Sequence, residues 1–248
     1  MIWFLAVAAA FPSGVAIAAV MSSTNYKIQS DSLNFGGVRS NSSSYAIEDT
    51  LGEIATGISS STNYIMNAGY QQMQVTYIAI TSAANVVMSP AIGGVSGGTA
   101  TGNTSFTVTT DDPAGYTGTI QASTSPALVN NASSTVSFAD YLPGGANPDF
   151  TFTNAATASS LGFSPKGTDI SSRYLDNGSN ACGTGSSQTV GACWDGLSTS
   201  PKTFLSRTSG NQPSGTLTTL NFQAASGSNH IQLSGTYTAT STVTVIPL

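Results

Sequence analysis

The stretch Gly235-Thr-Tyr-Thr-Ala-Thr-Ser-Thr-Val-Thr-Val-Ile-Pro-Leu248 decides which fold this chain is expected to adopt. Its side chains alternate without a slip, so Tyr237, Val243 and Val245 lie on one face of an extended strand and the intervening threonines lie on the other. A sheet needs this period of two when one face covers a core and the other meets water. Thr and Val also suit a pleated surface. The stretch is therefore predicted to be a β-strand.

Similar alternating segments, separated by Gly, Pro and Asn, recur through residues 75–248. The expected strands lie near 75–80, 85–88, 105–109, 116–122, 135–138, 150–152, 203–205 and 217–224. No segment keeps a helical period, and residues 139–200 are expected to be mostly long loops. This pattern predicts an all-β fold, with a Greek-key or jelly-roll-like β-sandwich as the larger domain. Long loops on such a scaffold often carry binding function.

Residues 19–74 contain an internal repeat that predicts a small module of three strands. Three Ser-rich segments each end in a tyrosine, and a second apolar residue follows two positions later, on the same face of a strand. The repeat core is Tyr26 with Ile28, Tyr45 with Ile47 and Tyr64 with Met66, at a spacing of 19 residues. A module of this size struggles to bury enough surface alone, so we expect it to rest on the larger domain or on a neighbouring copy.

Residues 1–18 are apolar and end in Ala16-Ile-Ala18, a small-residue pattern typical of signal-peptidase sites. They are interpreted as a secretory signal peptide that is cleaved before Ala19. The alternative is a retained membrane anchor, because the apolar run continues nearly to Met21. Either interpretation predicts an extracellular or cell-surface protein.

The composition restricts the possible partners. Charged residues make up 7% of the chain, with 6 Lys+Arg against 11 Asp+Glu and a net charge of -5. An average soluble domain has roughly 25% charged residues. Nucleic-acid binding depends on clustered Lys and Arg, and no basic run exists here, so nucleic acid is excluded as an expected partner.

Two cysteines and three neighbouring residues form the one constellation that suggests a site. Cys182 and Cys193 flank a Gly/Ser-rich loop and are predicted to form a disulfide, as expected of an exported protein. Trp194, Tyr174 and Asp195 are candidate ligand-binding residues, because an exposed aromatic ring beside a pinned loop could stack on a sugar. The alternative is that Trp194 packs over the disulfide.

No set of residues predicts catalysis. His230 is the only histidine, and no pair of acids is singled out by its spacing. The chain is therefore expected not to be an enzyme, and no cofactor or catalytic residue is predicted. Calcium binding near Asp111 or Asp176 is left open, since the second lies in an oxygen-rich loop that lacks the spaced carboxylates of an EF-hand.

Several motifs resemble those of uncharacterised secreted two-module β proteins from environmental bacteria. In the smaller module they are Asn25–Gly37, Asp49–Gly57 and Asn67–Gln71, and in the larger domain Phe138–Tyr141, Ala192–Asp195 and Gly235–Thr240. The closing strand is also similar to the last strand of WxL-type and pilin-like surface sandwiches, although Trp194-Asp-Gly-Leu197 departs from the Trp-x-Leu motif. The resemblance implies a surface sandwich without an assigned activity.

These observations favour an exported structural protein of the cell surface. It is expected to associate with copies of itself or with other surface proteins by pairing of β-strands. The alternative is an adhesin or carbohydrate-binding module that uses the 139–200 loops to bind glycans.

Overall fold

The computed structural model describes residues 76–248 continuously and, before them, six short strand segments. The chain divides into two units, Met1–Val75 and Thr76–Leu248. The predicted signal peptide at residues 1–18 lies outside the described residues, as do Tyr26, Tyr45 and Tyr64.

The described strands of the first unit form three separate antiparallel pairs. These strands are β1 (Met21–Ser22), β2 (Lys27–Ile28), β3 (Arg39–Asn41), β4 (Ala46–Glu48), β5 (Gly57–Ser60) and β6 (Ile65–Ala68). The innermost partners are Ser22 with Lys27, Asn41 with Ala46 and Ser60 with Ile65, so one pairing recurs every 19 residues.

Each predicted repeat unit therefore contains two paired strands among the described residues, where the sequence predicted one. Ile28, Ile47 and Met66 lie in β2, β4 and β6, the second strand of each pair. The first strands were missed because they are only two to four residues long and show no alternation of apolar and polar residues.

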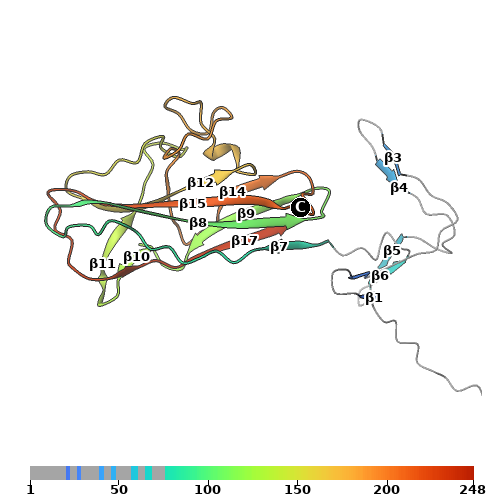
Figure 1. Cartoon of the computed structure of the whole chain (residues 1–248), viewed down its shortest axis with the longest axis horizontal. Coiled ribbons are helices and arrows are strands. Elements are labelled where there is room, and N and C mark those ends of the chain that lie inside the picture. The colour runs from blue at the N-terminus through green and yellow to red at the C-terminus, as the bar shows by residue number, and fades with distance from the viewer. Residues whose placement is uncertain are drawn as a thin grey trace, which may run out of the picture. The chain divides into compact units, whose positions relative to one another are not determined.

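The second unit contains two sheets (Figure 1). The large, eight-stranded sheet has the order β16-β10-β11-β12-β15-β8-β7, with β13 beside β12, and the small sheet has the order β14-β9-β17. The large sheet is made of β7 (Ile78–Ile80), β8 (Gly98–Thr110), β10 (Leu128–Asn130), β11 (Ser133–Asp140), β12 (Ser159–Gly167), β13 (Asp195–Gly196), β15 (Thr216–Ser226) and β16 (Tyr237–Thr238). The small sheet is made of β9 (Tyr116–Ala122), β14 (Lys202–Arg207) and β17 (Ser241–Pro247).

The two sheets share one apolar core. Phe106 and Leu220 of the large sheet pack in the same buried cluster as Ile120 and Phe204 of the small sheet. The rings of Phe106 and Phe204 meet edge to face, with centroids 6.3 Å apart. The prediction of an all-β fold is confirmed. The Greek-key or jelly-roll detail stays a prediction, and the large sheet contains a parallel pair, β11 with β12.

The closing stretch divides between the two sheets. β16 pairs with β10 of the large sheet, whereas β17 pairs with β9 of the small sheet along its whole length. Val243 and Val245 pack against the core, and Thr242 and Thr244 are exposed, as the alternation predicted.

Two predicted strands are absent, and one strand was not predicted. Residues 85–88 and 150–152 form no strand, and Asp149 beside the second segment makes an isolated bridge to Trp194. β12 lies within the segment predicted to be mostly loop. Residues 159–165 of β12 are buried on both faces, so they show no alternation, and Gly162 and Pro165 interrupt the run in the manner of a loop.

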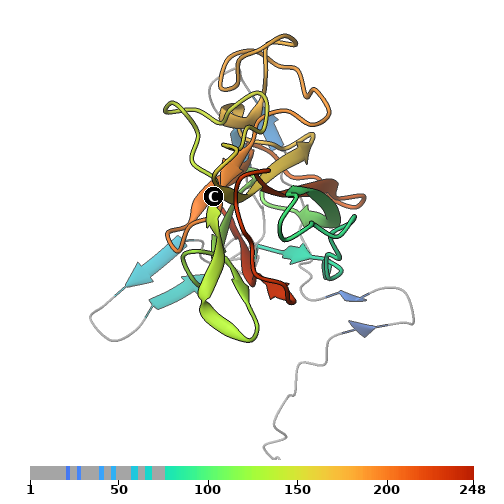
Figure 2. The same ribbon diagram turned by 90° about the vertical axis from the view of Figure 1, so that its left-hand side faces the viewer.

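The loops between β11 and β14 gather on one side of the sheets, where the yellow and orange segments project in both views (Figures 1 and 2). They include the 3-10 helix η2 (Ser172–Tyr174). Within the part of the chain that the structure describes, no helix is long and apolar enough to cross a membrane.

Candidate functional site

The three residues predicted to bind a ligand are buried. Trp194 is 4% exposed, and Tyr174 and Asp195 are 0% exposed. The indole Nε1 of Trp194 donates a hydrogen bond to the Gly191 carbonyl at 2.8 Å, and the ring meets the edge of Phe152. A ring that stacks on a sugar needs an open face, so the burial of both aromatic rings disfavours the stacking role and favours packing.

Asp195 is the centre of a buried charge network. Its carboxylate accepts hydrogen bonds from Lys202 at 2.7 Å, from Arg173 at 3.1 Å and from the Tyr174 hydroxyl at 3.1 Å. The amide of Gly196 donates a fourth, at 2.8 Å. Four donors around one carboxylate connect η2 to β13 and β14. The carboxylate of Asp195 is therefore occupied by contacts within the protein.

These contacts shift two pKa values in opposite directions. Burial by itself raises the pKa of Asp195, but the hydrogen bond and charge of Lys202 and the hydrogen bonds from Arg173 and Gly196 outweigh it, and the pKa falls below its usual value. Burial, followed by the charge of Asp195 and the hydrogen bond to it, raises the pKa of Tyr174. The tyrosine hydroxyl therefore stays protonated and donates, and the aspartate stays ionised and accepts.

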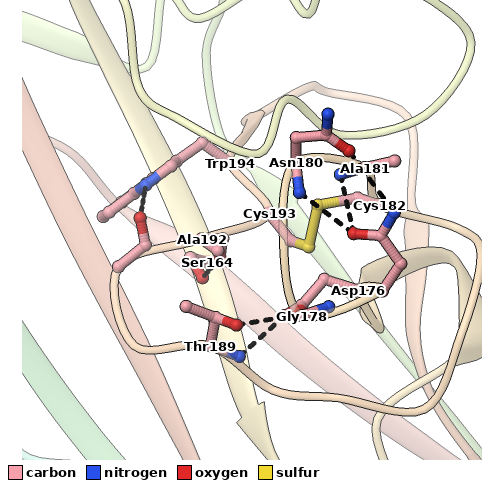
Figure 3. The surroundings of a disulfide bond; sticks show 12 residues. Ser164, Asp176, Gly178, Asn180, Ala181, Cys182, Thr189, Ala192, Cys193 and Trp194 are labelled. Carbon is pink, nitrogen blue, oxygen red and sulfur yellow. Dashed lines mark hydrogen bonds between the residues drawn. A yellow bond between two sulfur atoms is a disulfide. The ribbon is translucent and has the colours of Figure 1, made fainter.

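The predicted disulfide between Cys182 and Cys193 is present (Figure 3). Its S–S distance is 1.99 Å, and its Cα atoms are 5.7 Å apart. Both cysteines are buried in the core cluster. The segment that carries Cys193 is attached to β12 through the Ser164 hydroxyl, which donates to the Ala192 carbonyl at 2.6 Å.

Asp176, one of the two aspartates considered for calcium, is used within its loop. Its carboxylate accepts hydrogen bonds from the Gly178 amide and from both the amide and the hydroxyl of Thr189 (Figure 3). Burial by itself raises the pKa of Asp176. The hydrogen bonds from Thr189 and Gly178 and the charge of Lys166 lower it by more, so the net pKa lies below its usual value. The Lys166 ammonium is buried without a hydrogen-bond partner, and burial lowers its pKa.

Asp111, the other aspartate considered, belongs to a turn. Its Oδ1 accepts a hydrogen bond from the Tyr77 amide at 2.7 Å. Asp112 Oδ1 accepts another, from the Ala114 amide, at 2.8 Å. Among the described residues, no three His, Cys, Asp or Glu side chains gather as metal ligands would. Calcium at either place stays an untested possibility of the sequence and finds no ready ligand set here.

A different feature stands out in the small sheet, where the outer edge of β17 is open. β17 is the last strand in the order β14-β9-β17. The nearby β7 pairs only with β8. Within residues 76–248, no strand pairs with the outer side of β17. An uncovered edge presents unpaired peptide groups to any strand that approaches.

The direction of these peptide groups follows from the pairing. Thr240 accepts a bond from the Ser123 amide, and the Leu248 amide donates to Gly115. Antiparallel partners exchange hydrogen bonds at every second residue, and the register between β17 and β9 has no shift. The even-numbered residues of β17 therefore bond to β9, and the peptide groups of Ser241, Val243 and Val245 point to the open side.

The open edge is neutral and partly apolar. No charged side chain occurs between Thr236 and Leu248. Ile246 and Leu248 are 55% and 57% exposed, and Tyr77, which bonds to the same turn at residues 111–115, is 48% exposed. Edge strands are usually protected by charges, bulges or proline, and here only Pro247, at the end of the strand, provides such protection.

No family model, no curated protein and no solved structure matches this chain. The resemblances of the sequence to secreted two-module proteins and to WxL-type and pilin-like sandwiches therefore stay predictions. The open edge could not be located from the sequence, because edge position depends on the strand order, although the uncharged closing stretch was a signal for it.

Proposed function

We propose that this protein is an exported structural component of the cell surface that assembles through β17. The single observation that carries the proposal is the edge of β17, which has no charged side chain and with which no strand of residues 76–248 pairs on the outer side. The occupant we propose is β17 of a second copy, in antiparallel orientation about a twofold axis. Such isologous contacts are the commonest way in which identical subunits associate.

Pairing of two β17 edges would join the two small sheets into one. The peptide groups of Ser241, Val243 and Val245 would find partners, and the side chains of Ile246 and Leu248 would lose contact with water. The neutral surface supports this arrangement, because no charge has to be desolvated at the contact. Strand addition at a sheet edge is an established mode of protein association.

The first unit gives the proposal independent support. Its described strands belong to three separate two-stranded sheets. A two-stranded sheet is marginally stable in water, so such sheets need further contacts. Assembly with other copies or with other surface proteins would supply them.

Export is part of the same proposal. The Cys182–Cys193 disulfide is typical of proteins from oxidising compartments. Amino-terminal sequencing of protein recovered from the medium or the cell surface is expected to begin at Ala19. Recovery of the protein only from the cytoplasm, with Met1 retained, would contradict export.

The test of assembly is the mass in solution of the chain over a concentration series, measured by light scattering. We expect dimers or larger species to form as the concentration rises. Thr244→Lys adds a charge to the exposed face of β17, and in the twofold pair two such charges would lie on one face. This variant is expected to remain monomeric.

Thr203→Lys provides a matched control. Thr203 and Thr244 both pair with Thr119 of β9, on opposite sides of it, so the two variants add the same charge to one rung of the same sheet. The control is expected to associate like the parent chain. A parent chain that is monomeric throughout, or equal association of both variants, would overturn the proposal.

A further inference from the structure

The outer face of the large sheet is a second surface, and it carries rows of neutral polar side chains. β8 and β15 pair along eleven residues, from Thr216 with Val108 to Ser226 with Gly98. One set of side chains enters the core, and the other set forms rows of neutral polar groups on the outside. These rows are Thr101 with Gln223, Asn103 with Asn221 and Ser105 with Thr219. Neither strand contains a charged residue.

The loop that carries Phe152 covers β12 on this face. Gly162 of β12 pairs with Gln223, and the ring of Phe152 lies over the glycine. A Cβ at Gly162 would stand 2.9 Å from the Phe152 ring, so the glycine makes room for it. The β15 and β8 side continues beyond the ring as exposed and half-buried polar residues.

Phe152 is held in place by two aromatic neighbours. Tyr141 stacks on it with centroids 4.5 Å apart and an interplanar angle of 24°. Trp194 meets it edge to face at 5.4 Å. The Phe152 ring is itself half-buried, and part of it borders a hollow. Trp194, which the sequence suggested as a binding residue, thus supports the ring that reaches the surface.

The hollow has a volume of about 230 Å³. It lies where the loop layer meets the outer face of β8 and β15. Its lining is Gly98, Thr99, Phe152, Asn154, Gln223, Ala225, Ser226 and Gly227. None of these residues is charged. The hollow is smaller than pockets that take drug-sized ligands, which have volumes of roughly 300–1,000 Å³. The hollow therefore has room for no more than one small ring, and its lining offers no charged side chain to an ionic group.

The polar groups of the lining are suited to hydroxyl groups. Asn154 is fixed, because its Nδ2 donates to the Ala158 carbonyl and its Oδ1 accepts from the Ser160 hydroxyl, each at 2.8 Å. Gln223 and Thr99 border the hollow from β15 and β8. An amide both donates and accepts, and a threonine hydroxyl does the same, as the vicinal hydroxyls of a sugar require.

We propose that this hollow binds one unit of a neutral glycan, packed against Phe152 and hydrogen-bonded to Gln223 and Thr99. Further sugar units would follow the rows of Thr101, Asn103 and Asn221, which stand about 5 Å apart across strands and about 7 Å apart along them. The site lies on the outer face of the large sheet. It is independent of the β17 edge and of the proposed assembly.

The test is calorimetric titration of the full chain with hexasaccharides of glucose, mannose, galactose and N-acetylglucosamine, and with hexagalacturonate as a charged counterpart. We expect at least one neutral hexasaccharide to bind and hexagalacturonate not to bind. Gln223→Ala is expected to weaken the binding at least fivefold. Phe152→Leu, which keeps an apolar side chain but removes the flat ring, is expected to weaken it at least tenfold.

Gln121→Ala is the matched control, because Gln121 is a half-buried glutamine on the small sheet, outside the lining of the hollow. It is expected to bind like the parent chain. Should Phe152→Leu fail to fold, Gln223→Ala decides, since Gln223 lies at the surface. Absence of binding to every neutral hexasaccharide, undiminished binding by Gln223→Ala, or equal binding of hexagalacturonate would overturn the proposal.

Discussion

The two outer strands of the small sheet, β14 and β17, differ in the charges and hydrogen bonds at their outer edges. β14 carries Lys202 and Arg207, which pair with the buried Asp195 and Asp169. The outer edge of β14 is also covered by a neighbouring segment of the chain. The Ser171 amide donates a hydrogen bond to the backbone carbonyl of Phe204, and the Ser206 amide donates one to the backbone carbonyl of Asp169, both at 2.9 Å. β17 has no charged residue, and among the described residues no strand pairs with its outer side.

This difference separates stability from association. Charges and loop contacts at β14 hold that edge within the protein, so changes there are expected to affect unfolding. At β17 the same sheet ends without such contacts, so changes there are expected to affect what the protein pairs with. The predictions below test this division, beginning with the largest effect.

Asp195→Asn is expected to lower the free energy of unfolding by about 3 kcal/mol, because it removes the charge that Lys202 and Arg173 face. The cost lies at the low end for a buried ion pair, since both cations are partly exposed and remain hydrated. Urea unfolding followed by circular dichroism measures the change. A loss below about 0.5 kcal/mol would show that the network contributes little.

Asp169→Asn is expected to cost about 2 kcal/mol. Asp169 accepts hydrogen bonds from the Tyr116 hydroxyl at 2.6 Å and from Arg207 at 2.9 Å. Burial, and then the hydrogen bond to Asp169, raises the pKa of Tyr116, so the hydroxyl stays a donor. The same unfolding experiment applies, with Tyr116→Phe as the partner variant. If the two losses add fully in the double variant, the contact between them carries no coupling energy.

The strands of the two sheets and the residues around Asp195 show what the sequence could and could not predict. Alternation in the segments that became β8, β15 and β17 was visible, because each has one face on the core and one toward water. Tyr174 and Asp195, two of the residues predicted to bind a ligand, do meet, since the Tyr174 hydroxyl donates to the Asp195 carboxylate. Packing of Trp194 was the stated alternative, but the burial of Tyr174 and Asp195 was not predicted, because both lie against β12, a strand buried on both faces that shows no alternation in the sequence.

Long-range partners explain the rest of what was missed. Lys202 and Arg173 meet at Asp195 only because β14 and η2 are brought beside β13 by the fold. The Phe152 hollow likewise joins residues from β8, β15 and a loop that was predicted to be a strand. Local pattern records which face of a strand is apolar, but the strand order decides which edge stays open and which residues from distant segments meet.

The stability of the protein is expected to decrease as the pH falls below about 4, by less than the loss in Asp195→Asn. The pKa of Asp195 lies below its usual value when folded, whereas the unfolded chain has an ordinary aspartate pKa of about 3.9. As the pH falls, the unfolded state therefore binds protons first, and stability declines until the folded carboxyl is also protonated. Asp176 acts in the same direction.

Thermal unfolding of the parent chain and of Asp195→Asn between pH 6 and pH 3 measures this effect. The variant is expected to show a flatter dependence on pH, with the remainder due to Asp176 and other acids. Parallel curves for the two proteins would assign the acid sensitivity to other carboxyl groups.

The smallest effect on folding is expected at the open edge itself. Thr244 is exposed on β17, and its side chain is not in the core, so Thr244→Lys should change the free energy of unfolding by less than about 0.5 kcal/mol. Thr203→Lys, at the same rung on β14, should be equally mild. Urea unfolding at low protein concentration measures both changes without a contribution from association. A loss of 2 kcal/mol or more in Thr244→Lys alone would mean that the outer side of β17 makes stabilising contacts within the same chain. The β17 edge would then not be free to pair with another copy.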